Sequence, residues 1–346
     1  IMGQSPPSSS YNTKNDGLPF LQGNAEFGDK YPTIVKYTNQ PLKIAIKNDI
    51  LMSVRAPVGE INISNRQVCI GRGLGAIRVL DGNYLFYFYY LEHIKNFIKN
   101  LGQGSTFQAI TNNELKKIAV PILIKEEQTA IAKILSTTDE ALEVLERERL
   151  ATERLRRGIM VRLLENQKWK VVKLGEIAEF SKGKKPKAMI DGQKEGYLPY
   201  LSTDYLRDNL ETKYVSSSEE VVLVKDGEII LLWDGSNAGE FFEGKEGVLS
   251  TTMVKFNLKT DIHQKYLLYL LKSKQNYLQG QTNGTGIPHV DRKVLMDLDI
   301  TLPSIEEQKH IAEILSTIDK KLEVQKARKE KIERVKKGLM DELLTG

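Results

Sequence analysis

The sequence contains few of the residues that form disulfides, metal sites and membrane spans. It has one cysteine, Cys69, and four histidines in 346 residues. One cysteine excludes an internal disulfide, and the histidines show no spacing typical of zinc ligands. No run of 18 uninterrupted apolar residues is present, so no membrane-spanning helix is expected. We therefore expect a cytoplasmic protein with no metal and no membrane partner.

Motifs that carry catalysis are also absent. The sequence has no Walker-type GxxxxGK[ST], no GxGxxG after a strand, and no NPPY or DPPY such as adenine methyltransferases use around a flipped base. Residues 71–75, GRGLG, run into a strand-like AIRV, which disfavours a phosphate-binding loop. We predict that the chain is not an enzyme and binds no cofactor itself.

Outside the first third of the chain, basic and acidic residues are nearly balanced. The net charge is +5, and residues 1–120 alone carry 13 basic against 8 acidic residues, whereas residues 165–303 carry 19 against 20. The length predicts two or three domains, each large enough for its own core. Net charge alone does not indicate a nucleic-acid partner.

A long internal repeat organises the chain. Residues 126–164 align without gaps with residues 306–344, at an offset of 180, with 19 identities in 39 positions. The offset continues weakly upstream, for example at Gly59 and Gly239. The chain is therefore two copies of one unit. Residue 1 corresponds to Ser181, so the first copy has no counterpart of residues 167–180, and we expect a truncated N-terminus.

Each copy ends in a segment with the pattern of a long helix. Apolar residues recur at a mean spacing of 3.5, which predicts a coiled-coil seam. The seam positions are Ile131, Ile134, Leu135, Thr138, Leu142, Leu145, Thr152, Leu155, Ile159 and Leu163, then Ile311, Ile314, Leu315, Ile318, Leu322, Ile332, Val335, Leu339 and Leu343. Polar residues at Arg149, Gln325 and Lys329 predict a more polar contact in the middle. Thirty-nine residues make a rod of about 58 Å.

The part before each long helix reads as short strands and turns. Apolar runs at 50–54, 221–224 and 229–233 are separated by Gly, Pro, Asn and Asp. One helix is expected at 84–101 and its counterpart at 264–279. The aromatic run LFYFYY in the first of these favours a buried helix face over a base-stacking platform. Loop glycines such as Gly59 and Gly239 recur in both copies, which favours a structural role.

These residues together resemble a known family. The pattern GQSPPSSSYN, GLPFLQG, ILMSVRAPVGEINI, GSTFQAIT and EEQ..IA.ILS..D, present twice in degenerate form, is similar to DNA-specificity subunits of type I restriction-modification systems. The resemblance covers essentially the whole chain. It implies an α+β fold in which two similar mixed α/β target recognition domains are separated by two helices that form an antiparallel coiled coil. The expected divisions are 1–120, a truncated first recognition domain; 121–165, the central helix; 166–303, the second recognition domain; and 304–346, the C-terminal helix.

The resemblance also implies a function and partners. Each recognition domain would contact one half of a split sequence in double-stranded DNA, and the helices would act as spacer and as docking sites for two methyltransferase subunits. S-adenosylmethionine would belong to those subunits, and restriction subunits (translocase and endonuclease) would be further partners. Two alternatives stay open: a coiled-coil scaffold without a DNA role, and a self-contained DNA methyltransferase or nuclease.

Candidate DNA contacts are loop residues whose side chains suit base edges or phosphates. In the first recognition domain they are Gln4, Ser5, Tyr11, Asn12, Arg55, Arg72, Ser105, Thr106 and Gln108. In the second they are Lys182, Lys184, Lys185, Lys187, Thr203, Ser236, Asn237, Asn283, Thr285 and His289. The loop that carries Lys182, Lys184, Lys185 and Lys187, which we call the lysine loop, is interpreted equally well as a phosphate contact or as a solvated loop.

Candidate docking residues lie in the first turns of the repeated helices, where the copies are most similar. They are Glu127, Gln128, Ile131 and Asp139, with Glu307, Gln308, Ile311 and Asp319 at the offset of 180. Carboxylates at a helix N-terminus are also favoured by the helix dipole, which explains the glutamates without a partner.

Overall fold

The structure is a computed structural model that describes residues 1–101, 109–164, 169–282 and 287–345. The chain forms two compact units, each described here by itself. Unit 1 comprises Ile1–Arg147 with Lys326–Gly346, and unit 2 comprises Glu148–Gln325. The boundary between the units therefore falls in the middle of both long helices.

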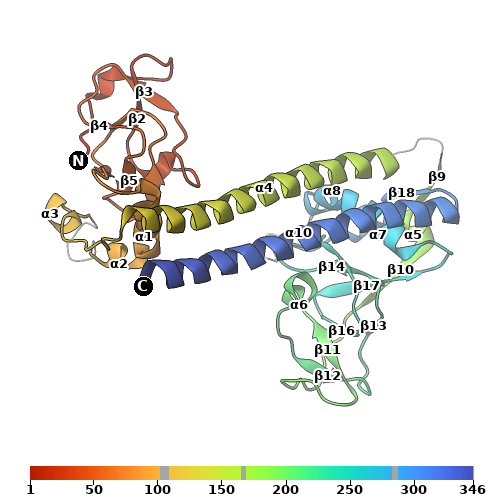
Figure 1. The fold of residues 1–346 in the computed structure, drawn as a ribbon. Helices are drawn as coiled ribbons and strands as arrows, with labels where there is room; N and C mark the ends of the chain where they lie inside the picture. Colours follow the sequence, from red (N-terminus) through yellow and green to blue (C-terminus); the bar gives the residue numbers. More distant parts are fainter. Residues whose placement is uncertain (102–108, 165–168, 283–286, 346) are drawn as a thin grey trace. The chain divides into compact units, whose positions relative to one another are not determined.

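Unit 1 begins with two small sheets (Figure 1). The larger has the order β1-β3-β2-β7-β4, with β2 and β7 parallel and the other neighbours antiparallel. The smaller has the antiparallel order β6-β5-β8. The strands are β1 (Tyr11–Asn12), β2 (Leu18–Leu21), β3 (Lys36–Thr38), β4 (Ile44–Ala45), β5 (Ile50–Ser53), β6 (Ile61–Ile63), β7 (Val68–Ile70) and β8 (Leu74–Ile77).

Helices follow the sheets of unit 1. They are α1 (Tyr84–His93), α2 (Lys95–Leu101), α3 (Asn112–Leu115) and the first part of α4 (Lys125–Leu164). Two short 3-10 turns, η1 (Ser8–Ser10) and η2 (Asn24–Glu26), lie before β1 and between β2 and β3. Asn83 caps α1, because its side chain accepts hydrogen bonds from two backbone N–H groups of the first turn. Phe86, Phe88 and Tyr89 of the aromatic run are buried, which confirms the core-face interpretation.

Unit 2 has a matching set of elements. Its strands are β9 (Lys170–Lys173), β10 (Ala178–Lys182), β11 (Tyr197–Leu201), β12 (Tyr214–Ser216), β13 (Leu223–Val224), β14 (Ile229–Leu232), β15 (Phe241–Glu243), β16 (Gly247–Leu249), β17 (Met253–Leu258) and β18 (Asp299–Leu302). Its helices are α5 (Leu174–Ile177), α6 (Thr203–Asp208), α7 (Gln264–Ser273), α8 (Gln275–Gln279), α9 (Arg292–Met296) and the first part of α10 (Ile305–Thr345).

The two units share their topology. The sheet order β12-β11-β16-β13 corresponds to β3-β2-β7-β4, and β17-β14-β15 corresponds to β8-β5-β6. The bounds of α1 and α7 differ by 180 residues, as do those of β6 and β15. The repeat predicted from the sequence is therefore a repeat of structure. Unit 2 adds β10 to its second sheet and pairs β9 with β18.

The single helices expected at 84–101 and 264–279 are each interrupted. α1 ends before Ile94 and α7 ends before Lys274, and a second short helix follows in both units. The prediction of one continuous helix was wrong at these two positions, because the backbone at both leaves ideal helical geometry, with ψ of 13° and 0°. The break recurs at the offset of 180 and is therefore part of the shared framework.

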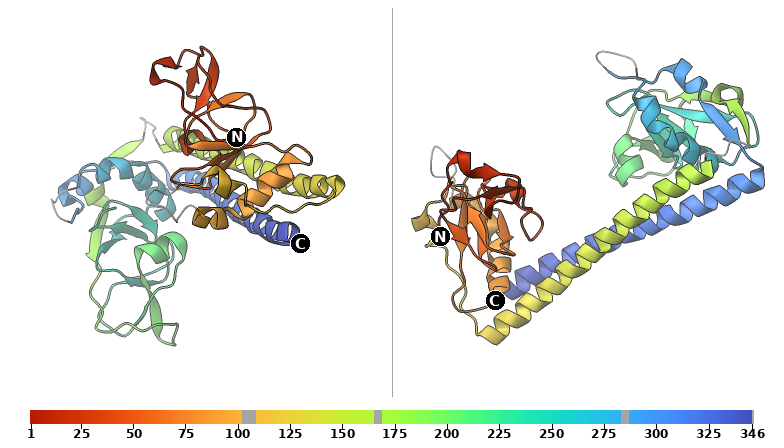
Figure 2. Two further views of the ribbon diagram at one scale, coloured as in Figure 1. Left: turned by 90° about the vertical axis from the view of Figure 1, so that its left-hand side faces the viewer. Right: turned by 90° about the horizontal axis from the view of Figure 1, so that it is seen from above.

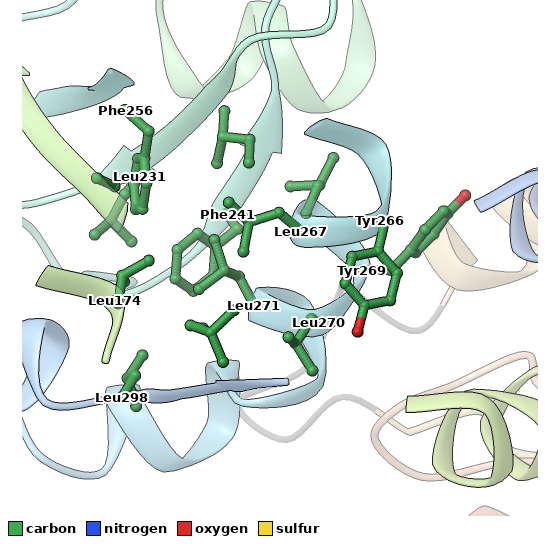
Figure 3. Close-up of a cluster of buried hydrophobic side chains, with 14 of the residues drawn as sticks. Leu174, Leu231, Phe241, Phe256, Tyr266, Leu267, Tyr269, Leu270, Leu271 and Leu298 are labelled. Atoms are coloured by element: carbon green, nitrogen blue, oxygen red, sulfur yellow. The ribbon is translucent and has the colours of Figure 1, made fainter. Parts of the chain in front are cut away.

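The core of unit 2 lies between its second sheet and α7 (Figure 3). Leu267, Leu270 and Leu271 of α7 are buried against Phe241 and Phe256 of the sheet. α7 buries all six residues from Tyr266 to Leu271, which explains why its middle contains only tyrosine and leucine, whereas its two ends are polar. Tyr266 and Tyr269 lie at the edge of this cluster, with their hydroxyl oxygens turned away from the leucine and phenylalanine side chains (Figure 3).

Within each unit, α4 and α10 run antiparallel. In unit 1 Lys329 Nζ of α10 lies 3.0 Å from Glu146 Oε2 of α4, and the C-terminal part of α10 lies along the N-terminal part of α4 (Figure 2). In unit 2 Arg156 Nε of α4 lies 2.5 Å from Asp319 Oδ1 of α10. The ion pair at Lys329 and the buried Gln325, 7% exposed, confirm the polar middle of the contact.

The predicted seam is wrong at three positions. Ile134, Leu155 and Val335 are 43%, 56% and 48% exposed. The residues buried instead are Met160, Leu164, Met340 and Leu344. These residues join the cores beneath the helices because each helix packs against its own unit as well as against the other helix. The buried stripe of each long helix therefore faces the core of its unit as well as the other helix, and it does not coincide with a simple two-helix seam.

Candidate nucleic-acid interface

Several strands of unit 2 end at a common edge, which we call the strand-end edge of unit 2. Because β10 and β14 both pair antiparallel with β17, they run parallel and end together, at Lys182 and Leu232. β11 and β16 are parallel and end side by side at Leu201 and Leu249. Loops that follow parallel strands meet at one edge, so this edge gathers side chains from distant parts of the sequence.

Four of the predicted DNA contacts of unit 2 meet at this edge. Lys182 Nζ lies 2.8 Å from Asp234 Oδ2, and Asp234 forms a backbone bridge with His289. Ser236 and Asn237 follow in the same loop and are exposed. The Gly235 N–H donates to Pro288 O at 2.9 Å, which holds the loop against the segment that carries His289.

Thr203 begins α6, directly after the end of β11. Ser202 caps this helix by accepting a hydrogen bond from the Tyr205 N–H at 3.2 Å. Because β11 ends beside β16, the start of α6 lies next to Ser250, whose Oγ is 3.2 Å from Tyr200 Oη. Thr203 is thus placed at the same edge by strand pairing.

Acidic groups accompany the lysine loop. Lys184 pairs with Glu220, and the Lys187 N–H donates to Glu219 Oε2 at 2.7 Å. Hydrogen bonding to Lys184 lowers the pKa of the Glu220 carboxyl, so that it stays ionised. Lys185 is exposed. Exposed ion pairs are weak, so Lys184 can exchange its carboxylate partner for a phosphate at small cost.

Unit 1 presents an equivalent strand-end edge. β2 and β7 are parallel and end at Leu21 and Ile70. The Gln4 N–H donates to Ile70 O at 3.0 Å, and the Arg72 N–H donates to Ser5 Oγ at 3.2 Å. Arg55 follows β5 and is joined to this edge through the Val54 N–H, which donates to Gly73 O at 2.9 Å. Gln4, Ser5, Arg55 and Arg72 therefore converge from three loops.

Tyr11 and Asn12 have local roles. The Tyr11 ring stacks on Phe20 at 4.7 Å between centroids, and its hydroxyl donates to Pro6 O at 2.9 Å. Asn12 Oδ1 accepts from the Lys14 N–H at 3.0 Å, and Asn12 Nδ2 donates to Asp16 O at 2.8 Å. Both side chains thus stabilise their own turn. The remaining candidates, Ser105, Thr106, Gln108, Asn283 and Thr285, lie outside the described residues.

Some residues at these edges were not among the predicted contacts. Gln22 follows β2, and its carbonyl accepts from the Gly73 N–H at 3.3 Å. Asp234 and Thr252 are joined by the Asp234 N–H, which donates to Thr252 O at 3.1 Å. One feature of the sequence could have identified these residues. Each of them directly follows or precedes an apolar run that forms a strand.

The candidate docking residues divide into buried and exposed groups. Gln128 and Gln308 are 3% exposed, and Ile131 and Ile311 are 6% and 0% exposed. Gln128 Oε1 accepts from the Asn83 N–H at 2.8 Å, and Gln308 Oε1 accepts from the His263 N–H at 2.9 Å. These four side chains tie each long helix to its unit and offer no surface to a partner in this structure.

The remaining docking candidates reach the surface. Glu127 and Glu307 are exposed, whereas Asp139 and Asp319 are partly buried in ion pairs with Lys336 and Arg156. Other apolar residues of the helices are exposed at equivalent positions. Val144 and Val324 are 50% and 66% exposed, like Leu155 and Val335 described above. Sequence reasoning assigned no partner role to these four residues.

The structural interpretation of two loop glycines is confirmed. Gly59 and Gly239 have φ of +83° and +96°, a region that disfavours residues with a side chain. A Cβ on Gly59 would lie 3.2 Å from Ile98 Cγ2, and one on Gly239 would lie 3.0 Å from Gln279 Cγ. Both turns therefore pack closely on the helix after α1 or α7.

The described ranges contain neither a metal-ligand cluster nor a membrane-spanning helix. Outside the four gaps, no group of three or more His, Cys, Asp or Glu side chains is arranged to hold a metal ion. No helix in the same ranges is both long enough and apolar enough to cross a membrane.

The fold and its edges define a class of protein. It is an α+β chain made of two equivalent units, which carry different loop residues at the ends of small sheets and are each packed on two long antiparallel helices. The chain belongs to the type I restriction modification DNA specificity domain family, whose model matches residues 1–152 and 166–334.

Individual relatives agree with this family. The type I restriction enzyme MjaVIII specificity subunit of Methanocaldococcus jannaschii is 49% identical over 178 residues, which cover 51% of this chain and 42% of that relative. The EcoDI specificity subunit of Escherichia coli is 27% identical over 179 residues, which cover 51% of this chain and 37% of that relative. The matched segments thus span less than half of these curated relatives.

A solved structure shares the fold over the full length. The S subunit of a type I restriction-modification system from M. genitalium matches with a TM-score of 0.69 and 19% identity, covering 99% of this chain and 92% of that one. At this identity the likeness establishes the fold alone.

Proposed function

We propose that the chain is a DNA-recognition subunit without catalytic activity of its own, and that each unit contacts one half of a two-part target in double-stranded DNA. One observation carries the proposal. Two units with the same strand order place different side chains at the same edge: Gln4, Ser5 and Arg72 in unit 1 stand where unit 2 has Lys184, Lys185 and Thr251. A shared framework with different loop residues suits two related ligands of different sequence.

The residue types at both edges suit DNA. Arg55 and Arg72 are exposed donors that match guanine edges or phosphates. Asn237 and Ser236 suit base edges, while Lys182 and Lys185 suit phosphates. The many acidic neighbours of unit 2 limit attraction at long range, so we expect the chain alone to bind DNA weakly and a partner to raise the affinity.

The partner we propose is a methyltransferase subunit, bound once to each repeat. Val144 and Val324 are exposed at equivalent positions of α4 and α10, as are Leu155 and Val335. Apolar residues that stay exposed on both copies support two similar docking surfaces for two copies of one partner. S-adenosylmethionine would then be bound by that partner, and restriction subunits would join the same complex. A solved relative with a TM-score of 0.58 comes from work on assembly of the type I R-M system.

The helices are the proposed spacer. α4 and α10 connect the units, because the unit boundaries fall at Arg147–Glu148 and Gln325–Lys326 inside them. Helix length would therefore contribute to the gap between the two half-sites. With this role in the modification of cellular DNA, we propose a cytoplasmic location.

Selection from random duplex DNA tests the proposal. The chain is incubated with a random pool, alone and with a type I methyltransferase subunit, and bound DNA is sequenced. We expect two short half-sites separated by a gap of fixed length and free sequence. No enrichment in either arm would favour the coiled-coil scaffold. S-adenosylmethionine binding to the chain alone, measured by calorimetry, would favour a self-contained methyltransferase.

A further inference from the structure

A tyrosine, a carboxylate and a cation join three elements of unit 1. The Tyr89 hydroxyl of α1 donates to Asp139 Oδ2 of α4 at 2.5 Å. The other carboxylate oxygen, Oδ1, lies 2.8 Å from Lys336 Nζ of α10. Tyr89 is fully buried. This arrangement, which we call the Tyr–Asp–cation clamp, links α1 to both long helices at one point.

Unit 2 contains the same clamp with the two long helices exchanged. The Tyr269 hydroxyl of α7 donates to Asp319 Oδ2 of α10 at 2.8 Å, and Asp319 Oδ1 accepts from Arg156 Nε of α4 at 2.5 Å. Each member lies 180 residues from its counterpart. Tyrosine and aspartate are retained, and Arg156 stands where unit 1 has Lys336.

Each unit adds its own charged groups around the clamp. In unit 1 Lys30 Nζ lies 3.2 Å from Tyr89 Oη and 3.6 Å from Asp139 Oδ2, and Glu92 Oε2 lies 3.9 Å from Lys336 Nζ. In unit 2 the position equivalent to Glu92 is Lys272, whose pKa is lowered chiefly by burial and raised in part by Asp319. The clamp is therefore retained while its surroundings have diverged.

The clamp differs in kind from the apolar packing around it. The buried side chains that pack α1 and α7 against the long helices make contacts that do not depend strongly on direction. A hydrogen bond from a rigid phenol to an ion-paired carboxylate requires a particular distance and angle. Burial, with the hydrogen bond to Asp139, raises the pKa of Tyr89, so its hydroxyl stays a donor.

We infer that Tyr89 and Tyr269 are positioning residues that hold each recognition part in one orientation on the helix pair and so narrow the range of gap lengths that the protein accepts in DNA. The inference rests on the proposed function. The clamp residues lie at the long helices, away from the strand-end edges, so their loss should leave the half-site bases unchanged.

The test is the double variant Tyr89→Phe with Tyr269→Phe in the full chain, followed by selection from random duplex DNA. We expect the same half-sites, a gap distribution that widens from one length to two or more, and affinity for the original gap lowered by about tenfold, as loss of a hydrogen bond to a charged group predicts. Tyr266→Phe is the matched control, because Tyr266 is buried in α7 but its hydroxyl donates to Thr301 O at 2.9 Å, within unit 2 and off the long helices. Unit 1 already has Phe86 at this position.

Conservative replacement separates positioning from folding. Arg156→Lys should retain a single gap, because it gives unit 2 the cation of unit 1, whereas Arg156→Met should widen the gap. Thermal midpoints of all variants identify any that fail to fold. A single unchanged gap in the double variant, or altered half-site bases, would overturn the inference. If the wild-type chain selects no two-part sequence at all, the proposed function fails and the inference fails with it.

Discussion

The two units share their strand order and the bounds of several elements, but they differ in the side chains at their strand-end edges. α1 and α7 occupy equivalent ranges, and Gln128 and Gln308 make the same kind of backbone contacts. At the edges, Arg55 of unit 1 corresponds to Asp234 of unit 2, and Arg72 corresponds to Thr251. Core positions are fixed by packing, whereas exposed loop positions can change without loss of the fold. The comparison therefore separates framework from specificity within one molecule.

The largest expected effects on stability come from substitutions at the buried positions that both units share. Leu135 and Leu315 are both 0% exposed at equivalent positions. Leu135→Ala and Leu315→Ala should each lower the free energy of unfolding by about 2–5 kcal/mol, because each leaves a cavity in a packed core. Leu155→Ala, at an exposed position of the same helix, is the control and should cost under about 0.5 kcal/mol. Urea unfolding measures all three, and a cost for Leu135→Ala as small as that of the control would contradict the shared framework.

Substitutions of side chains that differ between the two strand-end edges should affect one half-site only. Arg72→Ala should weaken discrimination at one base pair of the first half-site by about 1–3 kcal/mol and leave the second half-site unchanged. Arg66→Ala is the matched control, since Arg66 is also exposed but precedes β7, whereas Arg72 follows it. Sequencing of selected DNA measures both. Equal loss at both half-sites would mean that Arg72 contacts only phosphates.

The equivalent positions 92 and 272 should respond to pH in opposite directions. Burial raises the pKa of Glu92, although Lys336 partly opposes this, and Glu92 Oε2 has no hydrogen-bond partner in the described chain. The folded state therefore favours the protonated acid, so ionised Glu92 destabilises the fold at neutral pH. Glu92→Gln should raise the free energy of unfolding at pH 7, and this gain should disappear as the pH falls through the raised pKa.

Lys272 gives the opposite pattern. Burial lowers its pKa, so the folded state favours the neutral amine and the charged form destabilises the fold at neutral pH. Lys272→Met should raise the free energy of unfolding at pH 7, and this gain should shrink as the pH rises toward the ordinary lysine pKa of about 10.4. Glu140→Gln, at an exposed site, is the control for both. Chemical unfolding across pH checks the signs, and parallel pH trends for the two variants would refute the account.

The smallest expected effect on stability concerns Lys182 at the strand-end edge. Lys182→Ala should change the free energy of unfolding by less than about 0.5 kcal/mol, because its pair with Asp234 is exposed. If Lys182 contacts a phosphate, the slope of log affinity against log salt should fall by about 1. Lys173→Ala is the control, since Lys173 pairs with Asp299 at 2.6 Å and precedes β10 instead of ending it. An unchanged slope would remove Lys182 from the interface.

Sequence patterns predicted the framework better than the edges. The offset of 180 and the long helices follow from local periodicity, and the burial of Phe86, Phe88 and Tyr89 follows from an apolar helix. The acidic partners of the lysine loop were not foreseen, because Glu220 and Asp234 come from distant segments. The exposure of Leu155 and Val335 was missed for a related reason. A 3.5-residue seam assumes one partner helix, whereas each long helix also packs against its unit.

The central claim is that the two helices set the distance between two independent DNA contacts. Inserting four residues after Leu145 and four after Gln325 lengthens each helix by about 6 Å and adds about one turn, near the boundary between the units in both helices. Sequencing the DNA that this variant selects tests the claim most directly. The account predicts unchanged half-sites and a gap longer by about one or two base pairs, since each step is about 3.4 Å. Altered half-site bases, or an unchanged gap with binding retained, would contradict it.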